Sequence, residues 1–227
     1  MIGTMIGMAG AVVAAPSGPP PKATLFETFE PYTPGGLGGQ GLWSAQLGDG
    51  NKPRIDVVAG SLMDDVNSVK LVNAGSTSGW GYVEYPLTAL IGRPWQLTWD
   101  LKIPTGATAH TMEIDLLSGL VDPTYAKWSL GLTFKDLGGG AGGVTIYYEG
   151  HAAGETWGGW DLNLKRSATL IVNPDGTFTL KNNLMSPILS GVLFAGNETV
   201  REYSFSTDGV VPTVSTLMDN FHFETLP

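Results

Sequence analysis

Two carboxylates, Glu113 and Asp115, are the residues whose type and spacing best suit chemistry. They lie in the run Glu113-Ile114-Asp115-Leu116-Leu117-Ser118, which predicts a β-strand. Side chains two positions apart on a strand point to the same face, so both acids should share one face. Paired carboxylic acids facing a sugar can hydrolyse a glycosidic bond. The alternative is the solvated face of an ordinary strand.

Aromatic residues among glycines form the second set that could bind a ligand. They lie in two stretches that we expect to be loops, 78–82 and 150–161. An aromatic ring packs against the apolar face of a sugar while polar neighbours bond its hydroxyls. The same rings could instead plug the core or become buried against another subunit. The candidate carbohydrate-binding residues are Trp80, Tyr82, Trp157, Trp160 and Asp161.

Several other chemistries are excluded by composition and spacing. The chain has no cysteine, which removes disulfides, thiolate zinc sites and cysteine nucleophiles. His110, His151 and His222 are far apart and lack a metal-ligand spacing, and no Gly-x-Ser-x-Gly motif occurs. The glycine-rich stretch 138–143 lacks the Lys-Ser/Thr pair of a phosphate loop, so we expect a hairpin tip.

The charge of the chain argues against nucleic acid as a partner. A formal net charge of -9 is spread thinly along the chain and would repel phosphates. Hydrophobic residues make up 42% of the 227 residues, including seven tryptophans, so the chain can form a core despite 32 glycines.

The elements that must position these residues are predicted to be β-strands. Apolar and polar residues alternate along 95–103, and Asn173-Pro174-Asp175-Gly176 predicts a hairpin turn. No amphipathic helix is expected. The expected strands are Leu25 to Phe29, Arg54 to Val58, Ser68 to Val72, Gly81 to Tyr85, Trp95 to Ile103, Thr111 to Leu117, Trp128 to Phe134, Val144 to Tyr148, Ala168 to Val172, Phe178 to Asn182, Glu202 to Ser206 and Leu217 to Glu224.

The N-terminal segment has a different composition from the rest. Residues 1–15 are apolar, and a proline-rich linker follows at 16–21, so we expect an extension over 1–23 and one domain over 24–227. The apolar part is too short and glycine-broken for a transmembrane helix, and it lacks the basic start of a secretory signal. We expect it to contact other subunits of an assembly. A loose terminus or a truncated export signal are the alternatives.

The two ends of the domain carry the clearest resemblance to known proteins. Leu25-Phe26-Glu27-Thr28-Phe29-Glu30 opens it, and Met218-Asp219-Asn220-Phe221-His222-Phe223-Glu224 closes it. We expect these first and last strands to lie side by side. Over about residues 24–224 the chain resembles the concanavalin A-like lectin/glucanase superfamily and related carbohydrate-binding sandwiches. This implies an all-β fold, a two-sheet antiparallel jelly-roll sandwich.

The resemblance also implies roles for particular residues. In laminarinase-like glucanases the pattern Glu-x-Asp-x-Glu, or its bulged form, would make Glu113 the nucleophile and Asp115 its neighbour. The acid/base would fall at Leu117 or Ser118, neither of which can protonate a leaving sugar. A retaining enzyme is therefore not expected unless another acid, such as Glu84 or Glu149, takes that role. Calcium at Glu27, Glu30 and Asp219 is the one cofactor that the resemblance suggests.

These observations favour a non-catalytic structural or attachment protein of a larger surface assembly, such as a virion component, located on a virion or outside the cell. The apolar extension and the missing acid carry this expectation. A secreted carbohydrate-binding lectin module and an atypical glycoside hydrolase are the alternatives. The attachment role and glycan binding are compatible in one protein, so a glycan is a possible partner.

Overall fold

The computed structural model describes most of the chain beyond residue 23. The described residues are 24–44, 47–48, 54–60, 63, 67–72, 79–87, 93–108, 113–120, 126–182, 184, 186–195, 200, 202–209 and 214–227. The expected extension over 1–23, with its subunit contacts, lies outside them, so the boundary at residue 24 stays a prediction. Within the described part every regular element is a strand, and it contains no helix long and apolar enough to cross a membrane.

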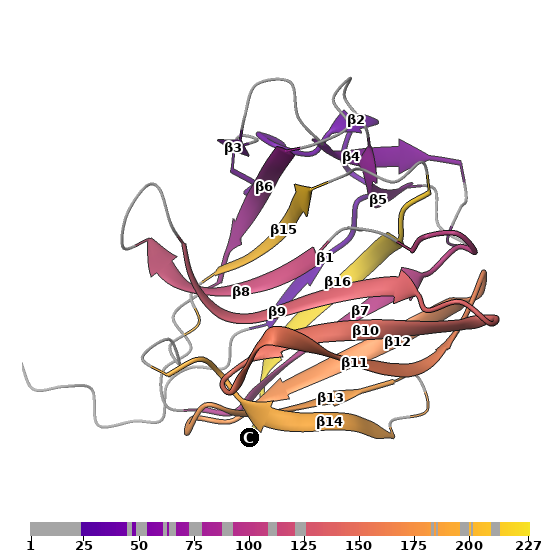
Figure 1. The fold of residues 1–227 in the computed structure, drawn as a ribbon. Helices are drawn as coiled ribbons and strands as arrows, with labels where there is room; N and C mark the ends of the chain where they lie inside the picture. The colour runs from indigo at the N-terminus through magenta and orange to yellow at the C-terminus, as the bar shows by residue number, and fades with distance from the viewer. Residues whose placement is uncertain are drawn as a thin grey trace, which may run out of the picture.

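The strands form two antiparallel sheets packed face to face, as the sequence predicted (Figure 1). The first sheet has nine strands. Its order is β14 (Pro187–Val192), β13 (Thr177–Lys181), β12 (Lys165–Val172), β7 (Trp95–Lys102), β16 (Leu217–Thr225), β5 (Asn67–Val72), β4 (Arg54–Ala59) and β2 (Gly35–Gly36), with β1 (Thr24–Glu27) paired to β16. The pairing of the first and last strands confirms the expectation from the chain ends.

The second sheet has seven strands and lies in front in Figure 1. Its order is β11 (His151–Asp161), β10 (Ala141–Tyr148), β9 (Ala126–Asp136), β8 (Glu113–Leu120), β15 (Glu202–Gly209), β6 (Gly79–Pro86) and β3 (Leu47–Gly48). The strand that carries the two carboxylates, β8, is therefore the central strand of this sheet.

The strands with a clear pattern are confirmed. Buried and partly buried residues alternate along β7 without a break. The turn between β12 and β13 closes through Asn173, whose N–H donates to the Thr177 carbonyl at 2.8 Å. Gly176 supplies the positive φ of 80° that this turn requires. The tip between β9 and β10 is confirmed too, although Gly142 and Gly143 belong to β10.

The strands without a pattern were missed. The two-residue strands β2 and β3 were not predicted, nor were β11 and β14, which lie at the edges of the two sheets. The stretches 150–161 and 78–82 were expected to be loops, and this is wrong, because they contain β11 and the start of β6. An edge strand such as β11 is exposed on both faces, so its sequence does not alternate.

Aromatic side chains fill the space between the sheets. Trp99 is fully buried and stacks on Phe221, with ring centroids 6.0 Å apart and an interplanar angle of 6°. Phe134, from the opposite sheet, meets Trp99 edge-on at 5.8 Å. Phe205 also packs edge-on against Phe221, at 5.1 Å. These contacts join β7 and β16 to β9 and β15, so this cluster fixes how the sheets stack.

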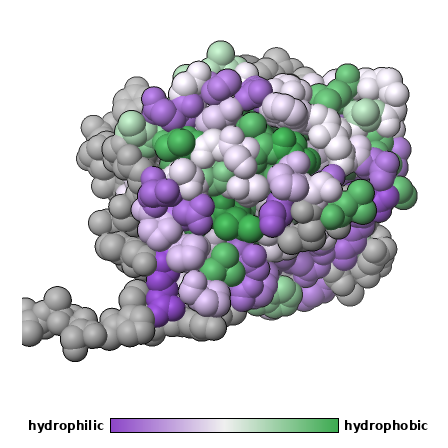
Figure 2. Space-filling view, turned by 90° about the horizontal axis from the view of Figure 1, so that it is seen from below, coloured by the Kyte–Doolittle hydropathy of each residue, from purple (hydrophilic) through white to green (hydrophobic). Residues whose placement is uncertain are grey.

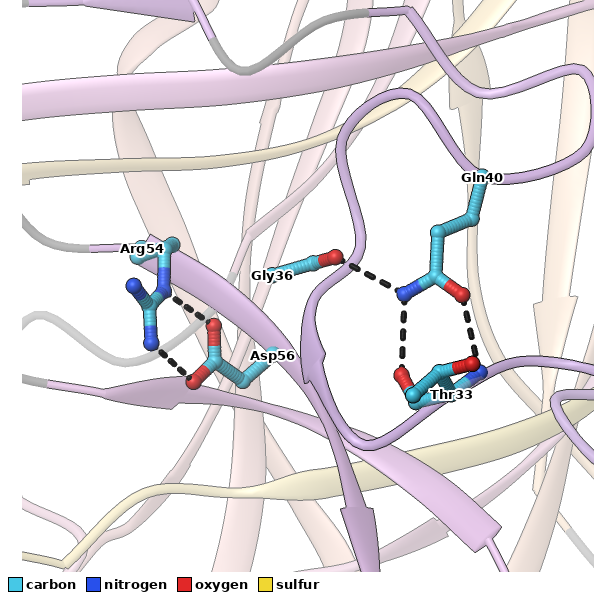
Figure 3. Close-up of polar contacts among 5 residues, drawn as sticks. All are labelled: Thr33, Gly36, Gln40, Arg54 and Asp56. Atoms are coloured by element: carbon cyan, nitrogen blue, oxygen red, sulfur yellow. Dashed lines mark hydrogen bonds and ion pairs between the residues drawn. The ribbon is translucent and has the colours of Figure 1, made fainter.

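The segment 33–40 leads from β1 towards β4 and is held by one amide side chain (Figure 3). The Gln40 Nε2 group donates to the carbonyls of Thr33 and Gly36 at 2.9 and 2.8 Å, and its Oε1 accepts from the Thr33 N–H at 2.8 Å. Arg54 and Asp56 form an ion pair on the neighbouring strand β4. The hydrogen bonds of Gln40 therefore fix the conformation of this connection.

Beside this segment, a carboxylate is buried among tyrosines. Glu27 accepts hydrogen bonds from Tyr32 and Tyr85, and burial raises the pKa of its carboxyl. Burial and the negative charge of Glu27 raise the pKa of Tyr85 to about 12. Tyr148 lies on β10, next to the edge strand β11 of the seven-stranded sheet. Its pKa is also raised to about 12, by burial and by its 2.6 Å hydrogen bond to Glu155.

The free energy of unfolding should fall as the pH rises from 10 to about 12. In this range the folded protein keeps phenol protons on Tyr85 and Tyr148 that the unfolded chain, with the ordinary pKa of 10.0, releases. Their stabilising contribution is complete below pH 10 and is lost through this window. Urea unfolding as a function of pH measures the fall, and the double variant Tyr85→Phe, Tyr148→Phe should reduce its slope. An equal slope in this variant would contradict the assignment.

Candidate functional site

The carboxylates of β8 lie on the outer face of the seven-stranded sheet. Ile114 and Leu116 are fully buried in the core, so Glu113 and Asp115 point to the opposite face, as alternation predicted. Asp115 is only 1% exposed and Glu113 is partly buried. Neighbouring strands therefore surround both acids.

A glycine on β9 provides the space for both carboxylates. Gly131 lies directly opposite Asp115 in the β8–β9 register. A Cβ atom at position 131 would lie 2.7 Å from Oε1 of Glu113 and 3.3 Å from Oδ1 of Asp115. The two carboxylates thus converge over the backbone of Gly131.

The ring of Tyr147, on β10, completes this row of the face. Tyr147 lies opposite Gly131, and its Cδ2 atom would be 3.3 Å from a Cβ atom there. On the other side, a Cβ atom at Gly154 of β11 would lie 2.7 Å from its Cε1 atom. The ring therefore fills the room left by two glycines. Burial, followed by the negative charges of Glu113 and Asp115, raises the pKa of the Tyr147 phenol.

Two apolar residues, Leu117 and Trp128, lie beside the carboxylates, at the position where a glucanase would carry its acid/base. Leu117 is 2% exposed but does not belong to the core cluster, which places it on the outer face. Trp128 lies opposite it on β9, with 47% of its surface exposed. A bulge between Leu116 and Leu117 separates this pair from the row of Asp115 and Gly131. An exposed indole therefore stands next to the acids.

A third acid shares the face. Glu84 on β6 lies between the core residues Val83 and Tyr85 and so points outward, although it is only 8% exposed. The register runs from Glu84 through Ser204 on β15 to Asp115. Two strand spacings of about 4.8 Å separate the backbones of Glu84 and Asp115. The other acid considered from the sequence, Glu149, instead accepts a hydrogen bond from the Ala195 N–H at 2.8 Å.

Of the aromatic candidates on β6, the structure gives only backbone positions. Tyr82 is paired with Ser206, which in turn is paired with Glu113, so its position falls in the row of that acid. Trp80 is paired with Asp208, two rows further along. The side chains of Trp80 and Tyr82 lie outside the described part of the structure.

The candidates on β11 are separated from the carboxylates. Trp160 is 4% exposed and packs edge-on against Phe134 at 5.2 Å, so it plugs the core, the second of its two expected roles. Trp157 is paired with the core residue Val144 and is 39% exposed. Asp161 forms an ion pair with Arg166 at 2.6 Å.

Trp157 belongs to the side of the sandwich where the edge strands β11 and β14 lie. Figure 2 shows this side from below, with hydrophobic residues in separate patches among hydrophilic ones. Trp157 and Val192 are exposed hydrophobic residues of the two edge strands. They do not join the face that carries Glu113 and Asp115.

The residues expected to bind calcium do not come together. Glu27 is paired with the core residue Phe221 and points into the sandwich. Asp219 is paired with Asp100, which alternates with core residues of β7 and so points to the outer face. Glu30 is exposed and accepts a hydrogen bond from the Asn67 N–H. Among the residues that the structure describes, no three His, Cys, Asp or Glu side chains form a group that could hold a metal ion.

Sequence reasoning did not select three residues of this face. Gly131, Tyr147 and Trp128 each lie on strands that were predicted, but their neighbours depend on the pairing of β8, β9 and β10. The only signal in the sequence was the phase of alternation, which places Gly131 and Tyr147 outside the core.

Comparisons with known proteins identify the fold. No protein-family model and no curated protein sequence matches the chain. Solved structures do match. The globular domain of T. cruzi calreticulin superposes with a TM-score of 0.57 at 10% identity, covering 88% of this chain and 87% of that one. A carbohydrate esterase from the Shiga toxin-encoding bacteriophage phi24B gives 0.53 at 14%, covering 82% and 90%.

A third match is the carbohydrate recognition domain of Emp46p in its potassium-bound form. It gives a TM-score of 0.51 at 11% identity, covering 81% of this chain and 88% of that one. Identities this low establish the fold alone. The chain has the concanavalin A-like, lectin-type jelly-roll fold that the sequence predicted.

Proposed function

We propose that this chain is a carbohydrate-binding, lectin-like domain that binds glycans on the outer face of its seven-stranded sheet. One observation carries the proposal: two carboxylates and a tyrosine ring converge over Gly131, and an exposed indole lies on the same face. The residues that would contact the glycan are Glu113, Tyr147 and Trp128, while Asp115, which is 1% exposed, lies beside Glu113 and adds its negative charge.

The chemistry of these groups suits an uncharged sugar. Carboxylates only accept hydrogen bonds, and sugar hydroxyls donate them, so the partly exposed Glu113 can accept a hydrogen bond from a hydroxyl. The Trp128 indole offers an apolar surface for the C–H face of the ring. Negative charge on Glu113 and Asp115, with Glu84 nearby, opposes sulfated, sialylated or uronic sugars.

The fold comparison adds support of a general kind. Two of the structures that match with a TM-score above 0.5 are described as a carbohydrate recognition domain and a carbohydrate esterase. The proposal takes up the lectin alternative from the sequence. The assembly role that the sequence favoured rested on residues 1–23, which lie outside the described part, and none of the comparisons supports a virion role. An extracellular location fits a glycan-binding domain.

Hydrolysis is a second candidate because Glu84 shares the face with Glu113 and Asp115. Two strand spacings of about 4.8 Å separate the backbones of Glu84 and Asp115, which is close to the carboxyl separation of about 6.5–9.5 Å in inverting enzymes. Release of reducing ends from β-glucans that is lost in both Glu84→Gln and Glu113→Gln would establish it. Without such release, the face only binds.

A glycan array with the purified chain tests the proposal. The array should include neutral gluco-, manno-, galacto- and xylo-oligosaccharides beside sialylated and uronic ones. We expect binding to at least one neutral class and none to the anionic classes. Failure to bind any glycan, or binding to anionic ones alone, would contradict the proposal.

A further inference from the structure

Gly131 is a glycine that the backbone of β9 does not require. It lies inside a strand, where glycine lacks a side chain to pack and weakens the strand. It is not among the glycines with positive φ, so an alanine could adopt the same backbone conformation. The reason for glycine here must therefore be the space above it.

The nearest groups in that space belong to the proposed binding face. The three atoms nearest to a Cβ atom at position 131 are Oε1 of Glu113 at 2.7 Å, Oδ1 of Asp115 at 3.3 Å and Cδ2 of Tyr147 at 3.3 Å. At 2.7 Å a Cβ atom and Oε1 cannot coexist. Because Oε1 is the far end of a flexible side chain, an alanine would displace the Glu113 carboxylate and leave the strand in place.

We propose that Gly131 is the specificity-determining position of this face. By admitting the Glu113 carboxylate over this point of the sheet, beside the buried Asp115, it places an acceptor for a hydroxyl of the bound sugar. The inference rests on the proposed function and adds to it the ligand class, neutral sugars with a free hydroxyl at the Glu113 carboxylate. Gly131 acts through the placement of Glu113 and is thus a positioning residue.

The double-mutant cycle of Gly131→Ala and Glu113→Ala tests this role. The probes are four neutral tetrasaccharides, built from glucose, mannose, galactose or xylose, titrated by calorimetry. For the tightest of them, Gly131→Ala should lower the affinity about tenfold to hundredfold, as expected for one lost hydrogen bond to a charged acceptor. In the Glu113→Ala background the same change should cost almost nothing, since the displaced carboxylate is already absent.

Gly158→Ala is the matched control. Gly158 also lies in a strand without positive φ, and its Cβ atom would be 4.0 Å from the Gly142 carbonyl and from Leu137, an ordinary contact. It should leave the affinity unchanged. If Gly131→Ala alone fails to fold, recovery of the fold in the double variant would show that the clash with Glu113 is the cause, and a double variant that also fails to fold would overturn the inference.

The outcomes distinguish a failure of the proposed function from a failure of the role assigned to Gly131. Wild-type protein that binds none of the four probes removes the proposed function, and the inference with it. Wild-type protein that binds a probe while Gly131→Ala binds it equally well overturns the inference alone. An equal loss from Gly131→Ala with and without Glu113 also overturns it, because the alanine would then act by a general distortion.

Discussion

The double variant Glu113→Gln, Asp115→Asn is expected to lose about tenfold in affinity for a neutral oligosaccharide. Each amide keeps the size of the acid, but a hydrogen bond to a charged acceptor contributes about 1.5–3 kcal/mol and one to a neutral acceptor about 0.5–1.5 kcal/mol. The difference of about 1–1.5 kcal/mol at Glu113 converts to about tenfold in the dissociation constant. Calorimetric titration measures the loss, and thermal unfolding checks the fold.

The fold should survive this change. The two carboxylates converge over Gly131, so their replacement removes a repulsion between like charges. We expect the unfolding temperature to stay the same or to rise. Asp161→Asn is the matched control, because Asp161 is an exposed acid on the edge strand β11 that bonds to Arg166 of β12. A double variant that binds as tightly as the wild type would show that Glu113 does not contact the glycan.

Trp99→Ala is expected to cause the largest loss of stability, about 3–5 kcal/mol in the free energy of unfolding. Trp99 is fully buried and contacts Phe221 of its own sheet and Phe134 of the opposite sheet. The alanine would leave a cavity where the sheets meet. Urea unfolding followed by circular dichroism measures the change.

Trp99→Phe provides the control for this prediction. The Nε1–H group of Trp99 is buried without a hydrogen-bond partner among the residues that the structure describes. Phenylalanine keeps an aromatic ring in place and removes that donor, which offsets part of the lost volume. We expect a loss well below that of alanine. Equal losses for both variants, or a loss below about 1 kcal/mol for alanine, would contradict the central place of Trp99 in the core.

Much of the fold could be predicted because each sheet is covered by the other sheet on one face only. Strands such as β7 bury alternate residues, and this leaves a period of two in the sequence. The edge strands β11 and β14 could not be predicted, since most of their residues are exposed or partly exposed and their burial follows no period of two. The glycines of β11 also give this strand the composition of a loop.

Only the part of the candidate site that lies on a single strand could be predicted from the sequence. Alternation alone placed Glu113 and Asp115 on a shared face. Gly131, Tyr147 and Trp128 join them through strand pairing, and the bulge beside Leu116 shifts that pairing by one residue. Such a shift leaves no mark in the sequence of β8 itself.

The residues suggested for calcium lie apart for a related reason. Glu27 and Asp219 lie near the two chain ends that pair, so proximity along the strands suggested a shared ion. The register instead places Glu27 on the core face beside Phe221 and Asp219 on the outer face beside Asp100. An irregularity in the pairing between Asp219 and His222 sets the face to which each side chain points, and it places Asp219 and Glu27 on opposite faces.

The indole resonances of the tryptophans offer the most direct test of where a glycan binds. Trp128 is exposed on the face with the carboxylates, and Trp157 is comparably exposed on the edge strand β11. In a heteronuclear NMR titration with the tightest neutral oligosaccharide, we predict that the Trp128 indole and the Gly131 amide shift while the Trp157 indole does not. Shifts at Trp157 with Trp128 and Gly131 unmoved would contradict a binding site on the outer face of the seven-stranded sheet.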